Sequence, residues 1–327
     1  MASSAPEPPR ADPRGAVERP VRDPEDGTGR EADARPVVPA LVGPTASGKS
    51  AAAVLLAEEL GLEVVSADAM QVYRGMDIGT AKPTPAEQVR VRHHLIDLVD
   101  PADEFTVAQF QAAYRALDAD PAILVGGTGL YHRAVIDDLD LPGEWPELRA
   151  ELMTEPVEAL YARLTELDPA AAAKIEPTNQ RRLVRALEVT LGSGRRFSSF
   201  GPGLDAYPAN AIAQIGLRWD RVVLVDRIEQ RVHQMLAAGL VGEVERLLAA
   251  PGGLSRTAAQ ALGYKELIAH LRGDTSLAEA TDLIVVRTRQ FAVRQLRWFQ
   301  RDPRIEWVDV ERDPVTEAAS RVARALG

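Results

Sequence analysis

Residues 37–50 read VVPALVGPTASGKS, and the prediction of the fold starts from them. The apolar run 37–42 is rich in β-branched residues and is typical of a buried strand. The alanine- and leucine-rich run 50–60 is typical of a helix. Between them, residues 43–50 match the pattern G-x-x-x-x-G-K-[ST] at every position. This order of elements predicts a phosphate-binding loop made of Gly43, Pro44, Thr45, Ala46, Ser47, Gly48, Lys49 and Ser50.

Three kinds of group in this loop are predicted to hold phosphate. Its glycines let backbone N–H groups point into one concavity. The helix that follows adds the positive end of its dipole. Lys49 supplies a charge for the outer phosphates, and the Ser50 hydroxyl is the predicted ligand of a Mg²⁺ cofactor. Loops of this type are typical of nucleotide-binding and ATP-binding proteins.

The element that would accompany ATP hydrolysis is not evident in the sequence. ATPases and kinases with this loop also carry an apolar strand that ends in an aspartate, which holds the magnesium. The apolar run 122–125 ends in Gly-Gly-Thr-Gly instead, and the run 95–100 is short and interrupted by charge. The sequence therefore favours a phosphate-bearing substrate other than a hydrolysed nucleotide.

The whole chain predicts an α/β fold: a P-loop NTPase-like parallel sheet core with an inserted helical subdomain. Strands that alternate with helices form parallel sheets, and further strands are expected at 63–66, 122–125, 212–217 and 222–225. Helical periodicity is expected at 148–167, 181–191 and most of 227–300. The predicted parts are a disordered tail (1–36), core segments (37–140 and 211–311), the helical insertion (141–210) and a C-terminal extension (312–327).

Composition narrows the class of protein further. The 327 residues include no cysteine, which excludes disulfides, cysteine-ligated zinc and thiolate catalysis. Because no signal-peptide pattern and no apolar run of membrane-spanning length is seen, we expect a cytoplasmic protein without membrane contact. No coiled-coil seam is seen, so a monomer is expected. The net charge of −10 disfavours nucleic-acid binding unless arginines cluster, as Arg181, Arg182 and Arg185 do.

A longer signature begins at Asp68. Residues 68–83, DAMQVYRGMDIGTAKP, closely resemble the signature of the tRNA dimethylallyltransferases, also called tRNA isopentenyltransferases. Other segments resemble that family in the same order, namely 43–50, 126–131, 181–189, 263–267 and 287–299. The resemblance covers roughly residues 37–310. One departure is Ala69, where the family usually has a serine.

The resemblance implies a reaction and roles for residues. A dimethylallyl group moves from dimethylallyl diphosphate to the N6 amine of the adenine 3′-adjacent to the anticodon, and diphosphate is released. Asp68 resembles the general base, and Thr128 resembles a threonine that faces the reaction channel. The family also has a diphosphate-binding arginine in the segment that corresponds to residues 227–232. Arg231 is the favoured candidate for this role, and Arg227 remains an alternative. The implied partner is the tRNA anticodon stem-loop, bound by Asp68, Ala69, Met70, Gln71, Arg181, Arg182, Leu183, Val184 and Arg185.

Other functions remain open at this point. An adenylate isopentenyltransferase that acts on free AMP, ADP or ATP shares the loop and Asp68, although it has less need of the insertion and the arginine pairs. A P-loop kinase of a small molecule is opposed by the missing strand-end aspartate. A non-catalytic RNA-binding module is opposed by the presence of Lys49, Ser50 and Asp68 together.

Overall fold

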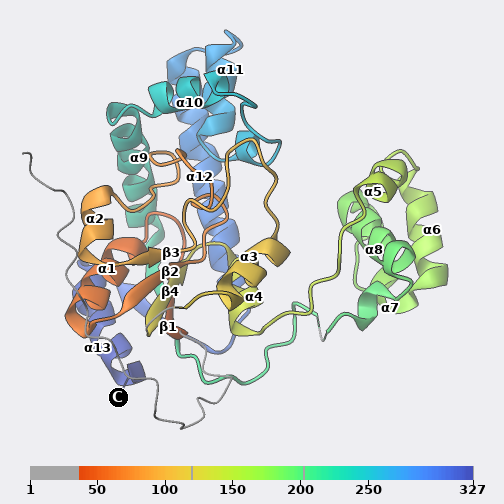
Figure 1. Ribbon diagram of the computed structural model, residues 1–327, viewed down its shortest axis with the longest axis horizontal. Helices are drawn as coiled ribbons and strands as arrows, with labels where there is room; N and C mark the ends of the chain where they lie inside the picture. The colour runs from red at the N-terminus through yellow and green to blue at the C-terminus, as the bar shows by residue number, and fades with distance from the viewer. Residues whose placement is uncertain (1–36, 119–120, 202, 327) are drawn as a thin grey trace, which may run out of the picture. The chain divides into compact units, whose positions relative to one another are not determined.

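A single parallel sheet organises the molecule. The computed structural model describes residues 37–118, 121–201 and 203–326, so the predicted tail at 1–36 lies outside the described residues. Within them, six strands pair in the order β3-β2-β4-β1-β5-β6, all parallel (Figure 1). The strands are β1 (Val37–Val42), β2 (Glu63–Ser66), β3 (His93–His94), β4 (Ala122–Gly126), β5 (Gln214–Trp219) and β6 (Ile305–Val310). The predicted α/β class is confirmed.

Helices follow most of the strands. Those before the insertion are α1 (Lys49–Leu60), α2 (Pro85–Arg90), α3 (Val107–Arg115) and α4 (Gly129–Ile136). The insertion holds α5 (Pro146–Leu152), α6 (Val157–Leu167), α7 (Pro169–Ala172) and α8 (Gln180–Ser193). The last are α9 (Arg221–Ala237), α10 (Leu240–Ala249), α11 (Tyr264–Leu271), α12 (Leu277–Phe299) and α13 (Pro314–Leu326).

The sheet separates two hydrophobic cores because successive side chains of a strand point to opposite faces. Leu41 and Ile123 face a core that includes α1 and α13. Ala40 and Leu124 face the other core, which includes side chains of α3, α4, α11 and α12. Figure 1 shows α1 beside α13 and α3 beside α4. With both faces covered, the central strands are apolar throughout, as parallel strands usually are.

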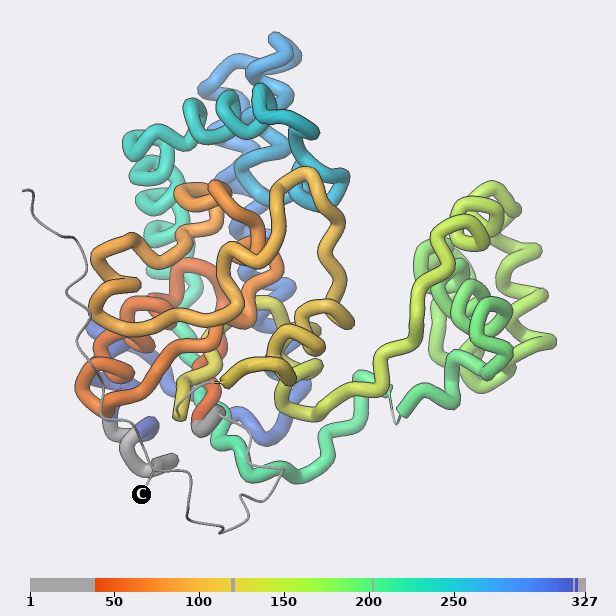
Figure 2. Tube along the Cα trace, viewed as in Figure 1, coloured from red at the N-terminus to blue at the C-terminus, as the bar shows by residue number. Residues whose placement is uncertain are grey.

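The insertion has a small core of its own. Leu160, Leu164, Leu183 and Leu187 are all fully buried in it. The predicted helical stretch 148–167 is two helices, α5 and α6, because Pro156 disfavours helical geometry in the residue before it. Figure 2 traces an extended segment from α4 to α5 and another from the end of the insertion to β5.

In the described part of the chain, no helix is both long enough and apolar enough to span a membrane.

One expectation about the second half of the chain was wrong. Residues 222–225 belong to α9 rather than to a strand: the Asp220 side chain caps that helix by accepting from the Val222 N–H at 2.8 Å. Val222 is 69% exposed, so this apolar run is not buried as a central strand would be. The segment 312–327, predicted as a C-terminal extension, contributes the buried side chains of Ala318 and Val322 to the core on one face of the sheet.

Candidate active site

Three neighbouring strands bring the predicted site residues together. In the sheet β1 pairs with β4, and β4 pairs with β2, so their carboxyl ends lie at one edge. The loop 43–50 follows β1, Thr128 follows β4, and Asp68 follows β2. Open α/β sheets bind ligands in the crevice outside these strand ends. A cavity of about 1410 Å³ lies there, and Lys49, Ser50, Asp68 and Thr128 line it.

The loop adopts an anion-binding shape at the start of α1. Gly48 has a φ of 89°, a left-handed conformation that glycine adopts without strain, and α1 begins at the next residue, Lys49. The first N–H groups of α1 and the positive end of its dipole are therefore at the cavity. The Lys49 ammonium donates to the Pro44 carbonyl at 3.2 Å and so curls back over the loop.

Two side chains brace the loop from outside the cavity. The Trp219 indole N–H donates to the Ser47 carbonyl at 2.8 Å. The Arg227 Nε donates to the Ala46 carbonyl at 2.9 Å, and its guanidinium stacks 4.4 Å from the centre of the Trp219 ring. Arg227, one of the two arginines left open by the sequence, thus supports the loop and is not among the residues that line the cavity.

Arg231, unlike Arg227, lines the cavity together with Lys49 and Asp68. Burial, together with the charge of nearby Arg231, lowers the pKa of Lys49 to about 8, while Asp68 acts in the opposite direction. Burial also lowers the pKa of Arg231, again opposed by Asp68. Two partly desolvated cations that face one carboxylate leave an excess of positive charge, which a multiply charged anion would stabilise.

Thr128 connects the turn after β4 to the residues after β2. Its hydroxyl accepts from the Ala69 N–H at 3.1 Å. The Asp68 carboxylate accepts from the Met70 N–H at 2.9 Å, which fixes its orientation beside the turn. The turn is glycine-rich for a steric reason: a Cβ at Gly129 would lie 2.1 Å from the Trp298 ring. Asp68 and Thr128 are therefore held as one unit at the cavity.

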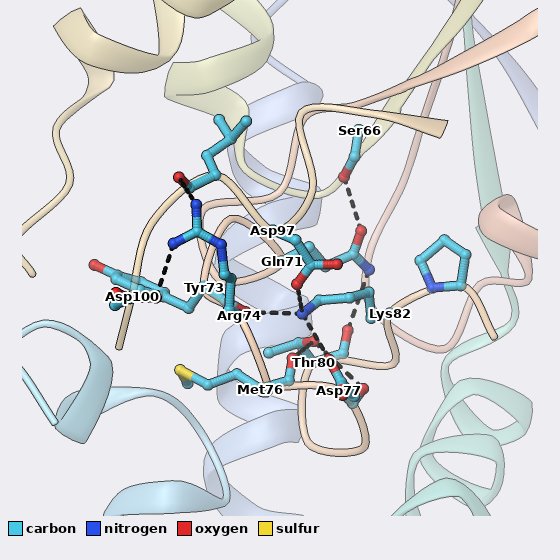
Figure 3. Close-up of polar contacts among 12 residues, drawn as sticks. Ser66, Gln71, Tyr73, Arg74, Met76, Asp77, Thr80, Lys82, Asp97 and Asp100 are labelled. Atoms are coloured by element: carbon cyan, nitrogen blue, oxygen red, sulfur yellow. Dashed lines mark hydrogen bonds and ion pairs between the residues drawn. The ribbon is translucent and has the colours of Figure 1, made fainter. Parts of the chain in front are cut away.

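The segment 68–83, which carries the longest sequence signature, folds around a buried lysine (Figure 3). The Lys82 ammonium donates to the Tyr73 carbonyl at 2.7 Å and to the carboxylates of Asp77 and Asp97, both at 2.6 Å. Its side chain is 2% exposed. A buried ammonium needs such partners because burial without them is costly. Asp97, one of the two aspartates of the run 95–100, is thus paired with Lys82.

Gln71 is held within the same segment. Its carbonyl oxygen accepts from the Ser66 hydroxyl at 2.8 Å, and its NH₂ group donates to the carbonyls of Thr80 and Ala81 (Figure 3). The residue is buried, although it borders the cavity. A role of Gln71 in binding tRNA stays a prediction, and the structure gives its side chain a set of internal partners.

A buried carboxylate binds the backbone of residues 77–79 in the segment 68–83. Glu243 of α10 accepts from the N–H groups of Asp77, Ile78 and Gly79 at 2.8–3.2 Å and from the Tyr264 hydroxyl at 2.5 Å. Burial and this hydrogen bond raise the pKa of Tyr264. A Cβ at Gly79 would lie 2.4 Å from the Tyr264 ring, so only glycine allows this approach.

The predicted tRNA-binding residues of the insertion divide into two groups. Arg181 and Arg182 are exposed at the start of α8, and Arg181 borders the cavity. Leu183 and Val184 are buried in the insertion core, so their side chains support α8 and do not face outward. Arg185 donates to the carbonyls of Pro142 and Gly143, both at 3.0 Å, which leaves Arg181 and Arg182 as the accessible charges of the cluster.

Sequence reasoning missed the supporting residues of the site. Gln295 of α12 accepts from the Thr45 N–H and donates to the Gly127 carbonyl, both at 2.8 Å. Glu243, Lys82 and Trp219 were also given no role. Gln295 and Lys82 lie in segments that carry the family resemblance, but which atoms they contact depends on chain positions that are far apart in sequence.

The fold and the cavity define an α/β protein in which residues of the loop 43–50 and the carboxylate-bearing Asp68 line one cavity. Comparison with known families identifies the group. A family model described as IPP transferase matches residues 71–302, and one described as isopentenyl transferase matches residues 36–102. The chain belongs to the IPP transferase family.

Individual relatives agree with this assignment. The chain is 48% identical over 303 residues to a tRNA dimethylallyltransferase of Pseudarthrobacter chlorophenolicus, covering 89% of this chain and 98% of the relative. It is 49% identical over 284 residues to one of Streptomyces coelicolor, covering 84% and 90%. The crystal structure of a tRNA isopentenylpyrophosphate transferase from Bacillus halodurans matches with 39% identity and a TM-score of 0.63, covering 90% and 97%. The protein is therefore a transferase.

The lowered pKa of Lys49 predicts a pH dependence of diphosphate binding. Lys49 loses its proton as the pH rises past about 8. Binding of inorganic diphosphate without Mg²⁺ then requires proton uptake, so we expect its Kd to rise by up to about tenfold per pH unit. A Lys49→Arg variant stays protonated and provides the control.

Calorimetric titrations between about pH 6.5 and 9.5 measure both proteins. The ionisation of diphosphate affects both equally, so the ratio of the two Kd values isolates Lys49. A ratio that stays constant across this range would contradict the lowered pKa.

Proposed function

We propose that this protein transfers a dimethylallyl group from dimethylallyl diphosphate to the N6 amine of the adenine 3′-adjacent to the anticodon of tRNA. The observation that carries the proposal is that Lys49 and Arg231, two cations for a diphosphate, line one cavity with Asp68, a candidate base whose charge acts on both. The names of the relatives support the same activity, since they are tRNA dimethylallyltransferases.

Asp68 is proposed to accept the proton that the reaction releases. The adenine amine is a poor nucleophile because its lone pair is delocalised into the ring. As its nitrogen bonds to the first carbon of the dimethylallyl group, that carbon's bond to the diphosphate oxygen breaks. The amine gives one proton to the Asp68 carboxylate, and the diphosphate leaves with the electron pair. The Met70 N–H orients this carboxylate and leaves its second oxygen for the proton.

The departing diphosphate gathers negative charge at the loop 43–50. Fixed cations and N–H groups aimed at this charge lower the barrier, because they are already in place when it develops. Lys49, Arg231 and the first amides of α1 fill this role. Thr128, whose hydroxyl is fixed by the Ala69 N–H, would border the path between the two substrates.

The donor atoms in the cavity fit a Mg²⁺ ion that is bound mainly through substrate. The described residues contain no group of three or more acidic or imidazole side chains arranged around a metal. Mg²⁺ commonly takes one or two protein oxygens, substrate phosphates and water. The Ser50 hydroxyl borders the cavity at the start of α1 and would be the protein ligand. When bound, the ion would neutralise part of the leaving group's charge.

The tRNA substrate would be held by the arginines of the insertion. Arg181 and Arg182 are exposed at the start of α8, and for neither does the structure record an ion pair within its described residues. Free guanidinium groups suit contacts with phosphate. An anticodon loop is single-stranded, so its bases can turn outward at a cost of a few kcal/mol.

We propose that the enzyme acts as a monomer in the cytoplasm.

Transfer of radiolabel tests this function directly. The protein is incubated with labelled dimethylallyl diphosphate, Mg²⁺ and either unmodified tRNA or AMP. Label in tRNA alone is the expected result. Label in AMP alone would instead indicate an adenylate isopentenyltransferase, and ATP consumption without prenyl transfer would indicate a kinase.

Replacement of Asp68 by asparagine tests the proposed base. The asparagine amide oxygen would keep an acceptor for the Met70 N–H, so the fold should persist. The amide takes up no proton, so we expect kcat to fall by about 10² to 10⁴ while the KM for both substrates changes little. Asp226→Asn, at an exposed position of α9, is the matched control. Steady-state kinetics that show full turnover by Asp68→Asn would remove Asp68 from this role.

The double change Arg181→Ala and Arg182→Ala tests the tRNA contacts. We expect the KM for tRNA to rise and the slope of log Kd against log salt concentration to decrease by about 1 to 2, because two phosphate contacts are lost. The KM for dimethylallyl diphosphate should not change. Arg163→Ala on α6, whose partner is Glu155, is the control within the same insertion. Equal losses for both substrates would argue against a tRNA contact.

A further inference from the structure

Gln295 joins two loops of the site that are distant in sequence. Its side-chain oxygen accepts from the N–H of Thr45 in the phosphate-binding loop, and its NH₂ group donates to the carbonyl of Gly127 in the turn after β4. Both distances are 2.8 Å. The side chain is 6% exposed. The orientation of the amide is fixed chemically, because only the oxygen can accept from an N–H and only the nitrogen can donate to a carbonyl.

We propose that Gln295 is a positioning residue that sets the spacing between the diphosphate loop and the unit formed by Thr128 and Asp68. This inference rests on the proposed function, in which the first group holds the donor and the second activates the acceptor. The reacting atoms belong to two different substrates, so the rate depends on how closely the two halves of the site are aligned.

The contacts continue from Gln295 to the proposed base without a gap. Gly127 precedes Thr128, whose hydroxyl accepts from the Ala69 N–H at 3.1 Å. Asp68 precedes Ala69 and is held by the Met70 N–H. One side-chain amide therefore connects the loop after β1, the turn after β4 and the segment after β2.

The surroundings of Gln295 leave it little freedom. A Cβ at Gly127 would lie 2.3 Å from its nitrogen, so the turn approaches the amide as closely as glycine allows. Ala292 and Phe299, which are both 1% exposed, anchor the same helix on either side. The helix α12 is 23 residues long and places Gln295 from outside the sheet. A rigid helix can hold both loops at a fixed distance where flexible loops alone cannot.

Only a side chain with both a donor and an acceptor at its end can make this connection. In Gln295→Glu, a carboxylate keeps the acceptor for Thr45 and faces the Gly127 carbonyl without a donor. In Gln295→Met, a side chain of similar length fills the space but leaves the Thr45 N–H and the Gly127 carbonyl without partners. Neither change alters Lys49, Arg231, Asp68 or the arginines of α8.

The test compares turnover with binding in the full-length protein. Label transfer to tRNA is measured at saturating concentrations of both substrates for the wild type, Gln295→Glu, Gln295→Met and the control Gln290→Glu. Gln290 lies on the same helix and is exposed. Kd values for inorganic diphosphate with Mg²⁺ and for tRNA are measured in parallel, and thermal unfolding checks that each variant is folded.

We expect kcat of both Gln295 variants to fall by about 10- to 100-fold, as misalignment of a bimolecular site does, while each Kd stays within about threefold of the wild type. If Gln295→Glu does not fold, Gln295→Met decides the matter alone. A kcat within about threefold of the wild type would overturn the inference. So would a loss of diphosphate affinity equal to the loss of kcat, because that would make Gln295 a structural part of the loop only. A wild type that prenylates no tRNA would refute the proposed function instead.

Discussion

The register of the parallel strands is the constraint on which the site depends. Val42 of β1 pairs with Gly126 of β4, and Val125 of β4 pairs with Ser66 of β2. These pairs place three strand ends level with one another, so the residues that follow each strand meet. A shift of one residue would turn every side chain of the shifted strand to the opposite face and would move the loop 43–50 relative to Asp68. The hydrophobic cores on the two faces fix this register, because each strand must match both.

The electrostatics of the cavity follow from this geometry. Lys49 and Arg231 come from α1 and α9, and burial lowers the pKa of both. Asp68 is the carboxylate whose charge opposes that shift in each case. An unliganded site of this kind holds cations close together in a partly desolvated space, which is unfavourable until an anion enters. In the proposed function, the arrangement that binds a diphosphate would therefore also stabilise it as a leaving group.

Polar contacts between distant segments turn these strand ends into a rigid site. Lys82 and Glu243 organise the segment 68–83 from inside and from α10. Trp219 and Arg227 brace the phosphate-binding loop from behind. Most of these bonds end on backbone groups, which lack a regular partner in loops and would otherwise be buried unpaired. These bonds therefore hold the loops in a defined conformation on the sheet.

Local sequence patterns were sufficient to predict most of the helices and strands and to nominate the residues of the candidate site. Within residues 37–60, the hydrophobic pattern indicates the strand and the helix, and the glycines and Lys49 indicate the loop between them. The signature that begins at Asp68 indicated the family. Local pattern was insufficient at residues 222–225, where four apolar residues fit either a strand or the first turn of a helix. It also gave no reason to expect that α13 would pack beside α1.

Which side chains contact one another depends on how the helices and strands pack. Arg227 and Arg231 are four residues apart on one helix, and only the packing of α9 showed that the first braces the loop and the second enters the cavity. Gln295 lies 250 residues from Thr45, so no local pattern could assign that contact. Neighbouring residues favour a helix, strand or turn through their backbone dihedral preferences and the spacing of their hydrophobic side chains. Contacts between residues distant in sequence depend instead on how whole helices and strands pack in the folded chain.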